Sequence, residues 1–180
     1  MRRLLVVAAL VALPFQLFAI NVKTRQVSKG GFLADFLRDL DDVQKKIMDL
    51  AAAVPADKYD WRPAPGVRSI SEVYMHIAGG NYVLASFVGV KPPGYDTGSL
   101  ETITDKPRVL DELKKSFANL RAAALSASDA DLDKTVKMFG NDITERAAFL
   151  NALTHLHEHL GQSIAYARVN GVVPPWTGNQ

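Results

Sequence analysis

The sequence contains no cysteine. This absence excludes disulfide bridges, zinc sites built on thiolates and any mechanism with a cysteine nucleophile, and it leaves the redox compartment undetermined. Beyond residue 19 the chain also has no surplus of either positive or negative charge. The 21 basic residues include Arg2 and Arg3, so the chain after residue 19 has as many basic residues as its 19 acidic ones. Because nucleic-acid-binding proteins normally present a basic surplus, binding to nucleic acid is disfavoured.

One long apolar run is present, at the N-terminus. Arg2 and Arg3 precede an uninterrupted apolar stretch, 4–13, and the small residue Ala19 suits a cleavage site. This pattern is typical of a signal peptide over 1–19 and predicts a secreted or periplasmic protein with no membrane attachment after cleavage. The alternative is an uncleaved anchor, although the apolar segment is slightly short of the roughly 20 residues that a membrane span needs. Residues 20–30 are expected to form a flexible lead-in.

The rest of the chain shows helical periodicity and no convincing strand alternation. Apolar residues recur at steps of three and four along four segments, which predicts amphipathic α-helices. The segments are 31–53, 70–88, 107–126 and 143–170. Their number and length predict an all-α fold, a four-helix bundle over 31–176, followed by a tail, 177–180. The last helix has the widest apolar face, so we expect it to be the most buried of the four.

The connections between these helices differ in character. Ser69 and Glu72 form the S-x-x-E pattern of a capping box at the start of the second helix. Residues 89–106 make a long Pro- and Gly-rich connection, and such length inside a compact domain favours a functional loop or a crossover. Residues 127–141 are polar and are expected to be irregular.

Three of the four histidines lie within the segment LTHLHEHLGQ (153–162). Each residue of an α-helix advances about 100° around the axis, so His155 and His159 project from one face, one turn apart. His157 lies about 200° from both, and we expect it to face solvent or to support the site from outside. The remaining histidine, His76, belongs to the inner stripe of the helix 70–88. Since facing helices of a bundle commonly build metal sites, His76, His155 and His159 are candidate ligands of one ion.

Three neutral imidazoles with an open position suit a divalent cation such as Zn²⁺, Ni²⁺, Co²⁺, Mn²⁺ or Fe²⁺. The ring nitrogens that do not bind metal need hydrogen-bond acceptors, and Asn81, Gln162 and backbone carbonyls are candidates. The alternative is that the histidines are core residues satisfied by ordinary hydrogen bonds, which is the commoner situation for a single buried histidine.

The same helix contains the pattern H-x-x-E-H, formed by His155, Glu158 and His159, which also occurs in inverted zincin peptidases. Those enzymes take an acidic third ligand from further along the chain, but residues 160–180 contain no Asp or Glu. The peptidase interpretation is therefore disfavoured. Glu158 lies about 60° from His155 around the helix, which makes it a candidate catalytic base. The alternative is that it is a polar residue at the rim of the bundle.

Three stretches of the chain are similar to segments of one known family. They are SISEVYMHIAGGN (69–81), HLHEHLGQSIAYARVNG (155–171) and WRPAPGVRS (61–69). The first resembles the helix that carries the first histidine of the DinB/YfiT-like superfamily, the second resembles its final helix, and the third is similar to the connection before the first histidine. The resemblance extends over residues 31–176. One departure is Leu160, where arginine is common in that family.

The resemblance implies a four-helix bundle with up-down-down-up topology, in which the connection 89–106 is the crossover. It also implies a divalent metal on three histidines, which correspond by position to His76, His155 and His159. Family members include transferases and isomerases that use mycothiol or bacillithiol. Those thiols are cytosolic, so an exported chain is unsuited to them. Other members are described as metal-dependent hydrolases.

We therefore expect a metal-dependent hydrolase or transferase that acts on a small molecule of unknown identity, with Tyr82 and Tyr166 as candidate hydrogen-bond donors. One alternative is a non-catalytic exported bundle that binds a metal or a small ligand. Another is a membrane-tethered interaction module, which requires that residues 1–19 are retained. A homodimer is compatible with such bundles, but no feature of the sequence selects it.

Overall fold

The computed structural model describes residues 30–94 and 96–178, and this part of the chain forms the expected bundle of four long α-helices. They are α1 (Phe32–Ala53), α2 (Ile70–Phe87), α3 (Lys106–Ser126) and α4 (Glu145–Val169). Each end lies within two residues of its expected position, so the all-α prediction is confirmed. The expected signal peptide, 1–19, lies outside the described residues. Among the described helices, none has both the length and the apolar character needed to cross a bilayer.

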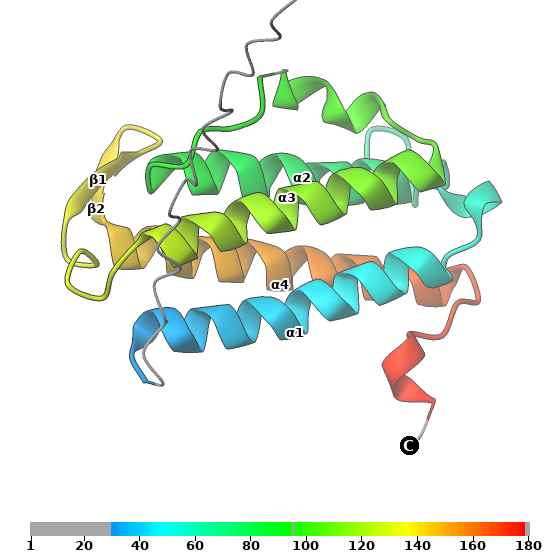
Figure 1. Ribbon diagram of the computed structural model, residues 1–180. Coiled ribbons are helices and arrows are strands. Elements are labelled where there is room, and N and C mark those ends of the chain that lie inside the picture. The colour runs from blue at the N-terminus through cyan, green and yellow to red at the C-terminus, as the bar shows by residue number, and fades with distance from the viewer. Residues whose placement is uncertain (1–29, 95, 179–180) are drawn as a thin grey trace, which may run out of the picture.

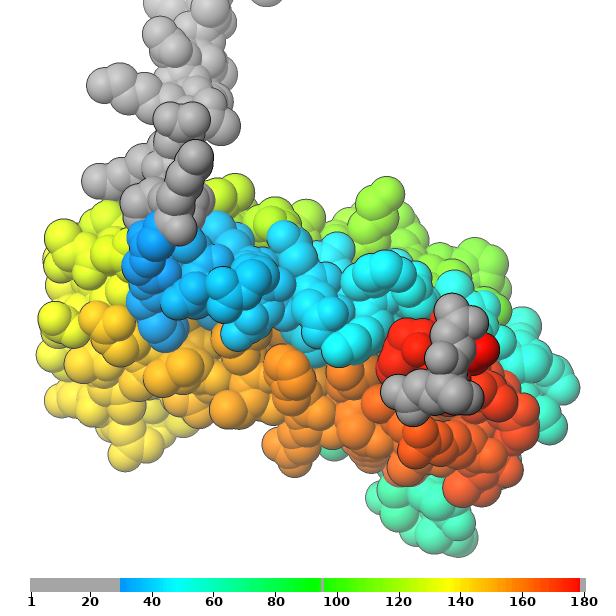
Figure 2. Space-filling view, turned by 90° about the horizontal axis from the view of Figure 1, so that it is seen from below, coloured from blue at the N-terminus to red at the C-terminus, as the bar shows by residue number. Residues whose placement is uncertain are grey.

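The order of the helices is up-down-down-up, as the family resemblance implies. α1 and α4 run in one direction, and α2 and α3 run in the other (Figure 1). α2 packs against α3 and α4, and α1 packs against the same two helices; Figure 2 shows α1 and α4 side by side on one face. Because α2 and α3 are parallel neighbours, the chain between them must return along the bundle. This crossover contains a 3₁₀ helix, η2 (Thr97–Thr102), that packs on α2.

The core forms where the four apolar stripes meet. Its fully buried side chains include Leu40, Ile47 and Leu50 of α1, Ile77 of α2, Leu113 and Phe117 of α3, and Leu156 of α4. Burial of each such side chain contributes roughly 1.5–3 kcal/mol to stability. The most buried helix is α2, with eleven of 18 residues buried against nine of 25 in α4. The expectation for the last helix is therefore wrong, because the crossover covers the side of α2 that α3 and α4 leave open.

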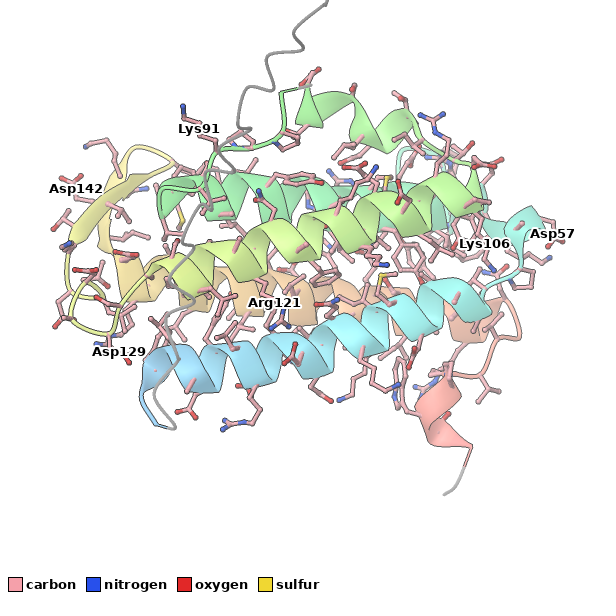
Figure 3. All side chains as sticks on the ribbon, in the orientation of Figure 1. Asp57, Lys91, Lys106, Arg121, Asp129 and Asp142 are labelled. Carbon is pink, nitrogen blue, oxygen red and sulfur yellow. The ribbon has the colours of Figure 1, made fainter. Side chains whose placement is uncertain are left out.

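Polar links tie α1 to α3 along the outside of the bundle (Figure 3). Lys106 donates hydrogen bonds from Nζ to the carbonyl oxygens of Ala52 (2.7 Å) and Val54 (2.6 Å), at the C-terminal end of α1. Arg121 of α3 forms an ion pair with Asp41 of α1. The carbonyls at a helix end have no partners within the helix, so Lys106 supplies a cation where α1 needs donors.

The start of α2 is set by the predicted capping box, which the structure confirms. The Ser69 Oγ accepts a hydrogen bond from the backbone N–H of Glu72 (3.3 Å), and Glu72 Oε2 accepts one from the N–H of Ser69 (2.7 Å). Hydrogen bonds from the Arg62 side chain and from the Ser69 backbone lower the pKa of Glu72. The capping box therefore determines where α2 begins, and with it the direction in which His76 projects.

A β-hairpin lies between α3 and α4, where the sequence predicts irregular structure. Strand β1 (Thr135–Met138) pairs antiparallel with β2 (Asn141–Thr144), with Met138 opposite Asn141. Phe139 and Gly140 form the two-residue loop, and both have positive φ, 49° and 85°, as a type I′ turn requires. The strands have only four residues each, too few for a clear alternation of apolar and polar residues. The expectation of irregular structure for 127–141 is therefore wrong in its last part.

Candidate metal centre

The structure brings together the three histidines that the sequence analysis selects. His76 projects from α2, and His155 and His159 project from α4; one ligand nitrogen of each lies within 4.8 Å of the others. The Nε2 atoms of His76 and His155 are 3.3 Å apart, and the ring centroids of His155 and His159 are 4.6 Å apart. His157 is exposed, and its Nδ1 lies 2.9 Å from the carbonyl oxygen of Leu153. The helical geometry thus separates His157 from the cluster.

Hydrogen bonds fix the orientation of two of the three rings. The Nδ1 of His76 donates to Glu101 Oε1 (3.1 Å), and the Nδ1 of His159 donates to Gln162 Oε1 (2.8 Å). Because a carboxylate and an amide oxygen only accept, the proton of each neutral ring lies on Nδ1. The Nε2 lone pairs of both rings are therefore available to a metal, as in most histidine-ligated sites.

The two acceptors are themselves held in place. Arg68 donates a hydrogen bond from Nε to Oε2 of Glu101, at 3.0 Å, and the two side chains form an ion pair. Gln162 donates from Nε2 to the Tyr166 hydroxyl (3.0 Å), and the Tyr166 ring packs edge-on against Trp61. Tyr166 thus helps to fix the side chain of Gln162, which in turn orients His159.

One of the predicted acceptors is confirmed and one is wrong. Gln162 accepts from His159, whereas Asn81 donates from Nδ2 to Ser116 Oγ on α3 (3.0 Å). Asn81 follows His76 by five residues, about 140° around the helix, so it faces a different neighbour. Sequence reasoning missed Glu101, because that residue lies on η2 in the crossover and its approach to α2 depends on the path of a long loop.

The third ring, that of His155, is positioned by packing against Gly80. A β-carbon at position 80 would lie 2.3 Å from Cε1 of His155 and 3.0 Å from each ring nitrogen. The Nδ1 of His155 is buried and has no hydrogen-bond partner among the described residues. The absence of a side chain at Gly80, one turn after His76 on α2, therefore creates the space that the ring occupies.

The surroundings of His76 and His155 favour the uncharged form of both rings. Burial lowers the pKa of His155 to about 4, and repulsion from the neighbouring His159, His76 and Arg68 adds to the effect. Burial also lowers the pKa of His76, with contributions from Arg68 and His159 that Glu101 partly offsets. Both imidazoles are therefore neutral near pH 7, and neutral imidazole is the form that binds metal. The donor set suits a borderline divalent ion.

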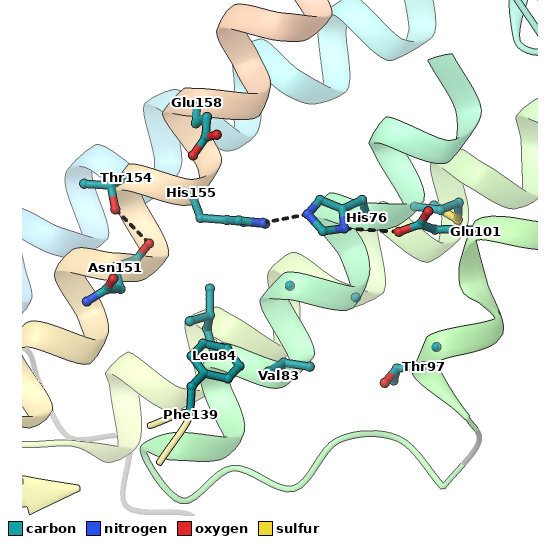
Figure 4. Close-up of a pocket in the computed structure, with 14 residues that line it drawn as sticks. His76, Val83, Leu84, Thr97, Glu101, Phe139, Asn151, Thr154, His155 and Glu158 are labelled. Atoms are coloured by element: carbon teal, nitrogen blue, oxygen red, sulfur yellow. Dashed lines mark hydrogen bonds and ion pairs between the residues drawn. The ribbon is translucent and has the colours of Figure 1, made fainter. Parts of the chain in front are cut away.

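A cavity of about 540 Å³ adjoins the cluster, and His76, His155 and Glu158 contribute to its wall (Figure 4). Glu158 is exposed at the edge of this cavity. Tyr82 does not line it; its buried hydroxyl donates to Glu112 on α3, at 2.8 Å. The cavity gives a small molecule access to two of the three imidazoles, with a carboxylate beside them.

Known proteins share both the sequence pattern and the fold. The sequence profile of the DinB superfamily matches residues 39–163. An uncharacterized protein of Bacillus subtilis (strain 168), YjoA, is 28% identical over 129 residues, which are 68% of this chain and 80% of that protein.

Solved structures give the same result for the fold. A DinB-like protein from Bacillus cereus ATCC 10987 superposes with a TM-score of 0.67 at 22% identity, over 80% of this chain and 93% of that one. The DinB-like YjoA of Bacillus subtilis superposes with a TM-score of 0.59 at 22% identity, over 79% and 92%.

Proposed function

The chain belongs to the DinB superfamily, and we propose that it holds a divalent metal ion on His76, His155 and His159 and acts with it on a small-molecule substrate as a hydrolase or transferase. The observation that supports this is the convergence of three imidazoles, two of them with Nδ1 engaged by Glu101 and Gln162. When bound, such an ion supplies a Lewis acid and lowers the pKa of coordinated water to around 7.

Each residue of the site has a distinct part in this proposal. The three histidines hold the ion, and Glu101 and Gln162 keep the Nδ1 protons of two rings and so orient their Nε2 atoms. Glu158 lines the same cavity as His155, and in this proposal its carboxylate accepts a proton from the nucleophile. Hydrolysis and group transfer both require an oriented electrophile and a proton acceptor, which is why the site supports either reaction.

Metal binding is the first test. Protein stripped with a chelator is titrated separately with Zn²⁺, Ni²⁺, Co²⁺, Mn²⁺ and Fe²⁺, and the bound metal is measured by elemental analysis. We expect one ion per chain in the wild type, a large loss of affinity in His155→Ala, and wild-type affinity in His157→Ala. His157 is a matched control because it lies on the same helix and is exposed. Equal affinities of all three proteins would overturn the assignment.

Catalysis is tested on the metal-loaded protein with ester, amide and phosphoester substrates. We expect turnover that requires the metal and that falls in Glu158→Gln without loss of bound metal. If chelation strongly lowers the melting temperature but no substrate is turned over with any metal, the non-catalytic alternative holds, in which the histidines serve folding or ligand storage.

We also propose that the chain is exported, on the basis of the charged and apolar pattern over 1–19. N-terminal sequencing of protein recovered from an expressing bacterium tests this. A mature chain that begins near Ile20 and is found outside the cytoplasm supports export. A chain that retains residues 1–19 in the cytoplasmic fraction contradicts it.

A further inference from the structure

The cavity beside the histidines has an apolar wall that the metal site does not explain. Val83 and Leu84 of α2 line it, together with Phe139 from the tip of the β-hairpin. Figure 4 shows the Phe139 ring close to Leu84, on the side of the cavity away from His76 and His155. A molecule that reaches the histidines therefore extends over an apolar surface toward the hairpin.

Phenylalanine is unfavourable at position 139 for two reasons, its backbone conformation and its exposure to solvent. Its φ of 49° lies in the left-handed region, and within the described residues no other non-glycine residue has a positive φ. The residue is also 70% exposed. The turn itself does not need phenylalanine, because the first position of a type I′ turn prefers Asn, Asp or Gly. Strained residues of this kind concentrate at ligand-binding sites.

The ring of Phe139 is held at the edge of the cavity by a contact from α2. It packs edge-to-face against Phe87, with ring centroids 5.0 Å apart. Phe87 itself does not line the cavity. The contact thus holds the Phe139 ring beside the cavity, where it forms part of the apolar wall.

The described lining of the cavity contains carboxylates but no cationic side chain. Apart from the histidines, the ionisable residues in its described lining are Glu101 and Glu158, and neither Lys nor Arg contributes to that lining. Glu101 is engaged by His76 and Arg68, and Glu158 lies exposed at the edge. An anionic group placed between Leu84 and Phe139 would lose part of its hydration, and the described lining has no Lys or Arg to compensate that loss.

We propose that the substrate is a small molecule with two different ends: a polar group that meets the metal site and an apolar body without negative charge that lies between Leu84 and Phe139. Phe139 is the residue that determines specificity for this body. The inference rests on the proposed metal-dependent function, and it adds the substrate class.

The test uses three hydroxamates as probes of the zinc-loaded full chain, with dissociation constants from isothermal titration calorimetry. The affinity for acetohydroxamate measures binding to the metal alone. Phenylacetohydroxamate adds an apolar ring to the same metal-binding group, and its 4-carboxyphenyl analogue adds a negative charge to that ring. We expect the phenyl compound to bind about tenfold more tightly than acetohydroxamate. We expect the carboxylate to remove that gain. Equal affinity for the first two probes, or tighter binding of the anion, would overturn the proposal.

Phe139→Asn is the decisive variant, because Asn-Gly is a favoured type I′ turn and the hairpin should still form. We expect the affinity ratio of the two uncharged probes to fall to near one. Leu125→Asn serves as the control: Leu125 is 43% exposed on α3 and does not line the cavity, so the ratio should stay near tenfold. An unchanged ratio in Phe139→Asn contradicts the assignment.

The apolar subsite is also measured without metal, so that its failure and that of the metal site are distinguished. Saturation-transfer NMR with phenylacetamide on chelator-treated protein should show ring contacts in the wild type and in Leu125→Asn, but much weaker ones in Phe139→Asn. If acetohydroxamate fails to bind and this pattern persists, the metal proposal fails and the apolar subsite stands. Equal signals in all three proteins would reject the subsite whatever the metal result.

Discussion

Alanine at position 80 should separate metal binding from folding stability. Gly80 lies in the middle of α2, and its missing side chain makes room for the ring of His155. A β-carbon there would lie 2.3 Å from Cε1 of that ring. The substitution therefore improves the local propensity of the helix and at the same time removes the space that one candidate ligand occupies.

The two effects have opposite signs. Replacing glycine with alanine inside a helix raises the free energy of unfolding by about 0.8–1 kcal/mol. Ordinary contact between carbon atoms begins at about 3.5 Å, so the His155 ring must move by about 1 Å or more. The ring can rotate because it is the end of a side chain, and the backbone need not shift. We expect the unfolding free energy of metal-free Gly80→Ala to stay within about 1 kcal/mol of the wild type.

Metal affinity should fall much more than stability. Loss of a group that merely orients a ligand typically costs 10–100-fold in metal affinity. Displacement of the ligand itself should cost about 100-fold or more, because Nε2 of His155 leaves the shared space with His76. Zinc affinity is measured by competition with a chromophoric chelator, and stability by urea unfolding in EDTA.

Gly79→Ala is the matched control for this experiment. It lies on the same helix, and a β-carbon there would meet only the carbonyl oxygen of Thr97, at 3.7 Å, which is an ordinary contact. It should gain the same helix propensity and keep wild-type zinc affinity. If Gly80→Ala binds zinc as tightly as Gly79→Ala, the steric account of His155 is wrong. If both variants lose zinc affinity equally, the loss comes from a change in α2 and not from displacement of the His155 ring.

Three further predictions concern the groups around α2. Glu101→Ala should lower metal affinity about 10–100-fold, because His76 loses the acceptor that fixes its proton; competition titration that shows no change would contradict this. Ser69→Ala should lower the unfolding free energy by about 1 kcal/mol in urea, through loss of the cap. The pKa of Glu72 is lowered in the folded protein from its usual 4.5, so its contribution is present above that pH and disappears as pH falls through the folded value. The stability difference between wild type and Glu72→Gln should therefore shrink on acidification below about 4.5, and a constant difference would refute this account.

Local sequence patterns were sufficient for the elements that depend on neighbouring residues. The periodicity of apolar residues located the four helices, and the S-x-x-E pattern located the start of α2. The separation of His155 and His159 from His157 also followed from helix geometry alone, because residues four apart share a face and residues two apart do not. For the same reason Gln162, three residues after His159, could be identified as an acceptor.

Contacts between distant segments were decided only by the tertiary structure. The crossover brings Glu101 to His76, 25 residues earlier, and the packing of α4 on α2 sets the His155 ring against Gly80. The hairpin carries Phe139 to Phe87 at the edge of the cavity. None of these pairs has a fixed spacing in the chain, since loop paths and helix packing depend on the whole core. The sequence by itself therefore determined which residues share a helix face, and tertiary packing determined which faces meet.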